Sequence, residues 1–295
     1  MDRFKDTNKA GIFGIMGNIF LLVIKAITGF ISGSQAMIAD AFNSASDIFA
    51  SLMTFIGNKI ASEPSDSSHN FGHGKAEYIF SMLISISMIL IAIKLLIDSA
   101  SSLLNGNELA FSWFLVLVCV ITIFIKLGLY IYTKILNMKY SNILLAANMK
   151  DHRNDCIVTT FTLISVLLTL VGIYWFDGIV GIGISLWIFY TGLTIFIESY
   201  NVLMDISIDP STRNKILDMS KKYEGIQRID NIYSSPVGYK YMVVLTICVD
   251  GNMTTFDSHN IADNLEKDIL KLETIESVII HVNPMWDYVD GVFSE

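Results

Sequence analysis

Six long apolar stretches fill the first two thirds of the chain, and they constrain its fold more than any other feature. They lie at about 11–31, 35–60, 76–103, 111–136, 143–174 and 178–203. Because a helix needs about 20 mostly apolar residues to cross a bilayer, each stretch is long enough to span a membrane. The composition agrees, with 53% hydrophobic and only 16% charged residues. The sequence therefore predicts an integral membrane protein with six transmembrane helices.

The basic residues between the stretches predict how these helices are oriented. Lys59, Lys75, Lys134 and Lys139 lie in or next to the linkers after the second and fourth stretches, whereas the linker 105–108 has no Lys or Arg. Short loops rich in Lys and Arg stay in the cytoplasm. We therefore expect a multi-pass protein of the cell membrane with both termini in the cytoplasm.

Residues 206–295 have the patterns of a small folded domain. Helix and strand signals follow one another in the order αββαβ, at 210–223, 226–234, 239–250, 257–272 and 277–282. This order predicts a ferredoxin-like α+β domain with its helices on one face of the sheet. The segment holds 14 Asp and Glu against 8 Lys and Arg, so nucleic-acid binding is not expected.

Two polar pairs interrupt the second and fifth apolar stretches. Asn43 and Asp47 are four residues apart, as are Asp151 and Asp155, so each pair shares one helix face. Such residues can simply pack helices together or lie at helix ends. Carboxylates inside a membrane are costly, however, and they generally mark an ion pathway. We predict that these four side chains enclose one divalent cation.

The ligand types of this set indicate the metal. One amide oxygen and three carboxylates suit Mg²⁺, Ca²⁺ and Mn²⁺, whereas Zn²⁺ prefers His or Cys. His152 is adjacent to Asp151 and points about 100° away from it on a helix, so it is not expected in the same cage.

Two further groups of residues are candidate metal ligands. Asp66, His69 and His73 lie within eight residues and can bind a transition metal, or the histidines can cap or contact neighbours in a polar loop. His259 and His281 lie far apart in the C-terminal segment, where isolated histidines are commonly surface residues. Both alternatives stay open for each group.

Three motifs carry a resemblance to a known family. They are Asn43-Ser44-Ala45-Ser46-Asp47, Phe71-Gly72-His73-Gly74-Lys75-Ala76-Glu77 and Asp151-His152-Arg153-Asn154-Asp155. With the six stretches and the αββαβ segment, they make the chain similar to the cation diffusion facilitators, which are divalent-metal/proton antiporters. The resemblance implies a homodimer and a transport site at Asn43, Asp47, Asp151 and Asp155, in the pattern of the manganese-exporting branch. It also places Asp66, His69 and His73 on the family's loop metal site.

The same resemblance covers a metal site in the cytoplasmic domain. His259 and His281 match two of its positions, while Ile229, Leu245 and Asn283 stand where a zinc-type member has His, His and Asp. We therefore expect this domain to dimerise the protein and to bind metal weakly.

These observations predict an exporter of Mn²⁺ that is driven by inward proton flow. Residues 1–205 form the transport domain and residues 206–295 the regulatory and dimerisation domain. Three crowded carboxylates repel one another without metal, so metal and protons are expected to compete for their oxygens. No cofactor is needed, because the metal is the cargo. Alternatives are efflux of Fe²⁺, Zn²⁺ or Cd²⁺, and a membrane-anchored metal sensor. An intramembrane aspartyl protease is disfavoured, because pairs spaced i,i+4 and joined by an Asn suit a cation better than a shared proton, so no enzyme is expected.

Overall fold

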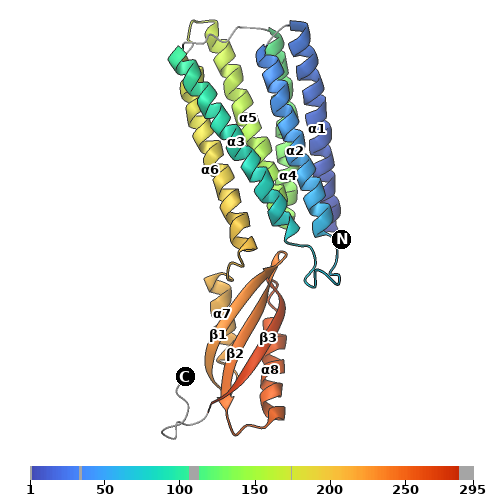
Figure 1. Ribbon diagram of the computed structural model, residues 1–295, viewed down its shortest axis with the longest axis vertical. Coiled ribbons are helices and arrows are strands. Elements are labelled where there is room, and N and C mark those ends of the chain that lie inside the picture. Colours follow the sequence, from blue (N-terminus) through green and yellow to red (C-terminus); the bar gives the residue numbers. More distant parts are fainter. Residues whose placement is uncertain (1, 33–34, 106–112, 174, 286–295) are drawn as a thin grey trace. The chain divides into compact units, whose positions relative to one another are not determined.

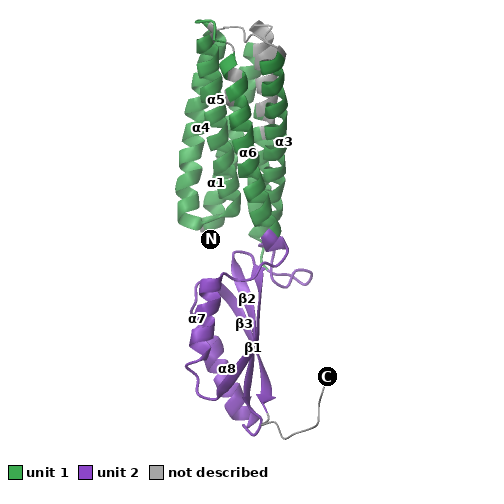
Figure 2. Ribbon diagram, turned by 90° about the vertical axis from the view of Figure 1, so that its left-hand side faces the viewer, with its two compact units in different colours: residues 1–64, 75–200 green, residues 65–74, 201–295 purple. Residues whose placement is uncertain are grey.

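The computed structural model describes residues 2–32, 35–105, 113–173 and 175–285, and for several helical residues, 35–43 among them, it describes the backbone alone. The chain divides into two compact units, which are coloured separately in Figure 2. The first comprises residues 1–64 and 75–200, and the second comprises residues 65–74 and 201–295.

The described part of the first unit is built from six long helices (Figure 1). They are α1 (Asp2–Ser32), α2 (Gln35–Ala61), α3 (Ala76–Asn105), α4 (Trp113–Tyr140), α5 (Ile143–Thr169) and α6 (Trp175–Leu203). Helix α5 packs against α2, α3 and α4, and α1 packs against α2 and α4. The predicted helical membrane domain is therefore confirmed.

Helix α1 begins earlier than its apolar stretch predicts. The first apolar stretch begins at about residue 11, yet α1 starts at Asp2. Thr7 and Ala10 are fully buried, and the Arg3 guanidinium donates to Glu77 of α3 at 2.7 Å. Polar side chains that find partners on neighbouring helices thus extend α1 beyond its apolar part.

Four of the helices are long and apolar enough to cross a membrane by length and composition, within the described residues: Arg3–Thr28, Ala76–Ser101, Trp113–Tyr140 and Gly181–Leu203. Helices α2 and α5 are long enough but more polar, with Asp47 in one and Asp151 and Asp155 in the other. The two helices that carry the predicted ion ligands are therefore those with the weakest membrane signal.

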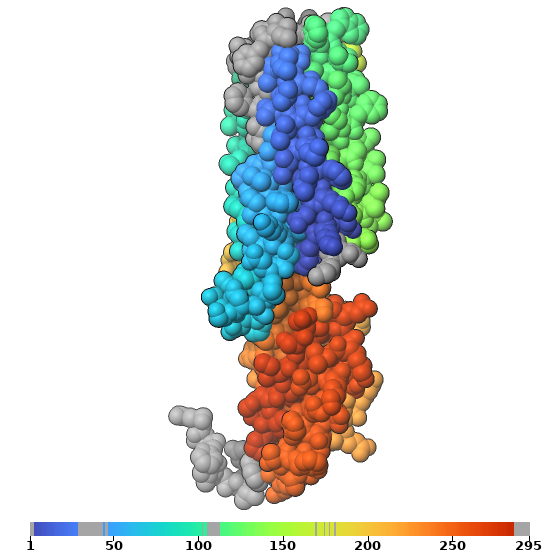
Figure 3. All heavy atoms as spheres, turned by 90° about the vertical axis from the view of Figure 1, so that its right-hand side faces the viewer, coloured from blue at the N-terminus to red at the C-terminus, as the bar shows by residue number. Residues whose placement is uncertain are grey.

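The first unit has apolar side chains outside and polar ones inside. Helix α1, blue on the face shown in Figure 3, exposes Phe13, Met16 and Phe20 by 48%, 62% and 52%. Asn18 and Lys25 of the same helix are 0% and 3% exposed. A lipid bilayer stabilises this arrangement, because it solvates apolar side chains and leaves polar groups to pair inside the bundle.

Helix α5 starts where Asn142 provides an N-cap. The Asn142 Oδ1 accepts hydrogen bonds from the backbone N–H groups of Leu144 and Leu145, which have no partner within the helix. The Asn142 side-chain amide also donates to Glu77 at 3.2 Å, and Glu77 is the partner of Arg3. One buried carboxylate therefore links the starts of α1, α3 and α5.

The second unit contains two helices and a three-stranded sheet, in the order α7 (Pro210–Ser220), β1 (Ile226–Val237), β2 (Lys240–Asp250), α8 (Thr255–Ile269) and β3 (Ile275–Met285). The strands lie in the order β1-β2-β3, with β1 antiparallel and β3 parallel to β2. The αββαβ order predicted from the sequence is therefore confirmed.

Local chemistry explains where these elements begin and turn. Asp209 caps α7 by accepting from the N–H groups of Ser211 and Thr212, and it also accepts from the Ser211 hydroxyl at 2.6 Å. Hydrogen bonds from the side chains of Ser211 and Thr212, and then from their N–H groups, hold the pKa of Asp209 below its usual range. Gly238, with a φ of 62°, makes the two-residue turn between β1 and β2. Strand β1 runs past its predicted end at Ser234 through Pro236, which an edge strand tolerates because no third strand needs its N–H.

The core of the second unit lies between the sheet and the two helices. Its centre is made of Ile216, Leu245, Ile247 and Leu265, all 0% exposed. Leu245 stands on the central strand, so truncation of its side chain leaves a cavity that the surrounding backbone cannot easily close.

Substitution of this central residue should weaken the second unit strongly. We expect Leu245→Ala to lower the free energy of opening of β2 by about 2–5 kcal/mol. Hydrogen–deuterium exchange of the full chain measures this change in peptides from β2. Ile279→Ala, at a residue that is 54% exposed, is the matched control and should have little effect. Equal effects of the two substitutions would contradict this description of the core.

Candidate functional site

A small cavity lies inside the first unit. Its volume is about 110 Å³, and residues of all six helices line it. The polar or charged lining residues are Lys25, Asp47, Lys94, Asp98, Thr122, Lys126, Asp151, Asn154, Asp155 and Thr159. Such a concentration of charge inside a membrane domain is the feature expected of an ion pathway.

Three of the four predicted transport ligands face this cavity. Asp47 comes from α2, and Asp151 and Asp155 come from successive turns of α5. Asp47 and Asp151 are 7% and 6% exposed, so their carboxylates are largely removed from solvent. The side chain of Asn43 lies outside the part of the chain that the structure describes, although its backbone belongs to α2.

A lysine that the sequence analysis missed lies between two of these carboxylates. The Lys126 Nζ donates to Asp47 Oδ2 at 2.7 Å and to Asp155 Oδ2 at 2.5 Å, and its side chain is 1% exposed. Lys126 stands in the middle of the fourth apolar stretch, where a charged residue is itself a functional signal. That signal was present in the sequence, but nothing in the sequence showed which carboxylates the lysine contacts.

Asp151 differs from the other two carboxylates. Among the side chains that the structure describes, its Oδ2 has no hydrogen-bond partner. An unpaired carboxylate oxygen in a buried site is costly. Asp151 is therefore the carboxylate of this set that is open to a cation.

The expected exclusion of His152 from the site is wrong. One ring nitrogen of His152 and one carboxylate oxygen each from Asp151 and Asp155 all lie within 4.8 Å of one another. The imidazole is 0% exposed, and neither nitrogen has a hydrogen-bond partner among the described residues. Neighbouring residues on a helix differ by about 100° in the direction of their Cβ atoms, but this angle does not fix where a rotatable side chain ends. The imidazole of His152 therefore reaches the site of Asp151.

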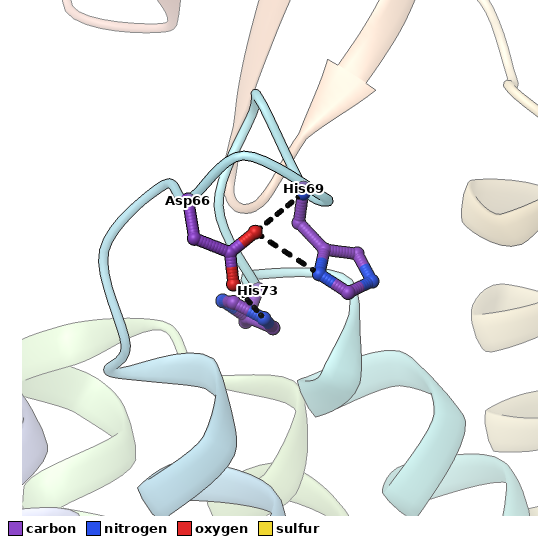
Figure 4. A group of neighbouring side chains, drawn as sticks. All are labelled: Asp66, His69 and His73. Carbon is purple, nitrogen blue, oxygen red and sulfur yellow. Dashed lines mark hydrogen bonds and ion pairs between the residues drawn. The ribbon is translucent and has the colours of Figure 1, made fainter.

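The loop between α2 and α3 brings Asp66, His69 and His73 together (Figure 4). One carboxylate oxygen of Asp66 lies 3.4 Å from His69 Nδ1, and the other lies 3.6 Å from His73 Nε2. Asp66 also accepts the backbone N–H groups of Ser68 and His69 at 2.8 and 2.6 Å, and these bonds lower the pKa of Asp66. Two imidazoles and an ionised carboxylate can hold a transition metal in such a geometry.

The two histidines of the second unit lie on different surfaces. His259 of α8 lines a hollow beside Val249, Ile280 and Val282. His281 is exposed on β3, and strand alternation points it to the opposite face from Ile280 and Val282. Among the described residues, neither histidine belongs to a cluster of three or more potential metal ligands.

Two of the three positions expected to lack metal ligands in this unit serve the core instead. Leu245 is fully buried, and Ile229 packs against the same cluster. Asn283 lies opposite Cys248 in the pairing of β3 with β2.

Sequence comparison gives these two units a family. Residues 12–204 match the cation efflux transmembrane domain, and residues 208–285 match the cytoplasmic domain of cation efflux proteins, which is a dimerisation domain. The first match alone covers more than half of the chain.

Full-length relatives agree with the domain matches. The magnetosome protein MamM of Magnetospirillum gryphiswaldense is 29% identical over 280 residues, which cover 92% of this chain and 86% of MamM. The manganese efflux system proteins MneP and MneS of Bacillus subtilis are each 26% identical, and the matches cover 97% and 96% of this chain and 99% and 98% of those proteins. The chain therefore belongs to the cation diffusion facilitator family: it is a multi-pass divalent cation efflux transporter, not an enzyme, with a cytoplasmic domain that implies a homodimer.

Proposed function

We propose that this protein exports Mn²⁺ from the cytoplasm across the cell membrane, through a site formed by Asn43, Asp47, Asp151 and Asp155. The observation that carries the proposal is the convergence of three carboxylates from α2 and α5 on one cavity inside the first unit. Residues 1–205 are the proposed transport domain. Residues 206–295 are the proposed regulatory and dimerisation domain, in the cytoplasm together with the N-terminus.

The preference for Mn²⁺ rests on ligand chemistry and on relatives. Carboxylate and amide oxygens suit Mn²⁺ better than Zn²⁺, and two relatives of similar length are named as manganese efflux proteins. The position of His152 favours a second candidate, which is efflux of Fe²⁺ or Zn²⁺, because its ring would add a nitrogen ligand to the site.

Protons are the proposed counter-ion. Asp47, Asp151 and Asp155 carry a charge of −3 when all are ionised, and Lys126 offsets only one of these charges. A divalent ion favours ionised ligands, so its binding expels protons from the carboxylates that it contacts. Metal and protons then compete for the same oxygens, and an inward proton gradient drives metal outward.

Transport should depend on both the carboxylates and the pH gradient. In proteoliposomes we expect the Mn²⁺ flux to rise when a pH gradient drives protons across the membrane in the direction opposite to the metal. Asp47→Asn and Asp155→Asn should reduce the flux to background, because each substitution removes the charge of a ligand while keeping the size of its side chain. Asp218→Asn, at an exposed residue of α7, is the control. Flux that ignores the gradient would contradict the antiport mechanism.

Selectivity should change when a nitrogen ligand replaces an oxygen. We expect Asp151→His to raise transport of Zn²⁺ relative to Mn²⁺, because imidazole is the softer ligand. Competition flux assays with both metals give the ratio directly. The parallel variant His152→Gln tests the second candidate, and a selective loss of Zn²⁺ or Fe²⁺ flux in that variant would support it. An unchanged ratio in Asp151→His would show that selectivity lies elsewhere.

A second metal is proposed at Asp66, His69 and His73. Asp66→Asn keeps an oxygen that can accept the N–H groups of Ser68 and His69, whereas Asp66→Ala removes it. We expect both variants to lose metal affinity at the loop, and only Asp66→Ala to speed amide exchange at residues 68 and 69. Since the pKa of Asp66 is lowered, protection of these amides should persist above its usual pKa and fade as the pH falls through the lowered value.

The metal affinity of the loop has to be measured in a variant whose transport site does not bind metal. Mn²⁺ and Zn²⁺ titrations of the full chain with Asp47→Asn provide it, and hydrogen–deuterium exchange reports the loop amides. Unaltered metal binding in Asp66→Ala would remove the loop from the set of metal sites.

A further inference from the structure

The buried lysine of α4 lies where a divalent ion would lie. Lys126 Nζ is 2.7 Å from Asp47 Oδ2 and 2.5 Å from Asp155 Oδ2. Oxygen ligands lie about 2.0–2.6 Å from divalent ions such as Mg²⁺ and Ca²⁺, so an ion shared by these two oxygens would need nearly the same space as the ammonium. The ammonium carries three donors and no acceptor, so it cannot join the ligands of a metal.

We propose that Lys126 is a tethered counter-cation of the transport site, and that its ammonium and the transported metal bind the same oxygens of Asp47 and Asp155 in turn. This inference rests on the proposed function, because it takes both carboxylates as metal ligands. Lys126 keeps its charge throughout, so the exchange is a change of position and not of protonation.

The remaining carboxylate gives the exchange an order. Asp151 is 6% exposed, lines the same cavity, and has an Oδ2 without a hydrogen-bond partner among the described side chains. An arriving ion binds there first, because Lys126 holds the other two carboxylates. Its double charge then displaces the ammonium from Asp47 and Asp155.

The cavity leaves space for this displacement. Its volume of about 110 Å³ exceeds the roughly 10–15 Å³ that a cavity needs to hold one water molecule. The lysine side chain has four rotatable carbons, so its ammonium can move while its Cα stays on α4.

The exchange explains how a charged site can release its cargo. Two carboxylates that lost a metal without a replacement would be left unpaired inside the helix bundle, which is costly. The returning ammonium pairs with both of them. Lys126 therefore lowers the affinity of the site for metal and speeds metal release.

A purely structural ion pair makes a different prediction. In that case loss of the lysine would destabilise the bundle, and the affinity for metal would stay unchanged or fall with the damaged site. The sign of the change in metal affinity therefore separates a tethered counter-cation from a structural pair.

The test is Mn²⁺ titration of the full chain in detergent, with every variant made in an Asp66→Ala background so that the loop does not bind the metal. The variant Lys126→Met removes the charge and keeps a similar length. We expect Mn²⁺ to bind about tenfold more tightly or better, because no cation competes for the oxygens. Turnover in proteoliposomes should fall, because release is slower. Lys134→Met, at an exposed lysine of the same helix, should leave both quantities unchanged. An unchanged or weaker affinity in Lys126→Met would overturn the proposal.

Two further variants keep the test decisive. If Lys126→Met does not fold, Lys126→Arg retains a buried cation, and its bidentate pairing should make Mn²⁺ bind about threefold more weakly or worse. Equal or tighter binding by Lys126→Arg would overturn the proposal.

Asp47→Asn separates the two levels of inference. If this variant binds Mn²⁺ as the unmodified protein does, the proposed transport site itself is wrong. If it loses Mn²⁺ while Lys126→Met binds no more tightly than the unmodified protein, the tethered counter-cation alone fails.

Discussion

The cost of holding charge inside a membrane is the constraint on which the rest of this structure depends. Asp47, Asp151 and Asp155 face one cavity among apolar helices, and each ionised carboxylate there needs a cation or a hydrogen-bond donor. Lys126 supplies that partner to two of them. Removal of one member of a buried ion pair typically costs about 3–5 kcal/mol. A transporter whose cargo is a cation can therefore use a cation of its own to keep the site stable between cargoes.

The scaffold holds these groups at fixed positions on rigid helices. Asp151 and Asp155 are set by where α5 begins, and Asn142 fixes that start by capping the first turn. Asn142 is in turn bonded to Glu77, which also binds Arg3. The N-terminal part of α1, which precedes the first apolar stretch, thus belongs to the frame that positions α5. Polar contacts at the helix ends and ionic contacts in the middle of the bundle therefore both help to fix the positions of Asp151 and Asp155.

Much of the architecture follows from patterns along the chain, because helix length, strand alternation and caps are local properties. The helix predicted at 210–223 starts where α7 does, and the i,i+4 spacing placed Asp151 and Asp155 on one face. Lys126 was missed because a lone charge in an apolar stretch does not reveal its partner, which comes from two other helices. His152 was wrongly excluded because helix geometry gives the direction of a Cβ and not the end of a rotatable side chain. The strand predicted at 226–234 is shorter than β1, because only the sheet order shows that β1 is an edge strand, which tolerates Pro236.

The central claim is that one pair of carboxylate oxygens serves Lys126 and the transported metal alternately. Anomalous diffraction from crystals of the full chain soaked in Mn²⁺ tests it most directly, because it locates the ion independently of the protein atoms. We predict an anomalous peak within about 2.0–2.6 Å of oxygens of Asp47, Asp151 and Asp155. The Lys126 ammonium should then have moved out of contact with Asp47 and Asp155. A peak away from these oxygens, or a bound ion beside an unmoved Lys126, would contradict the account.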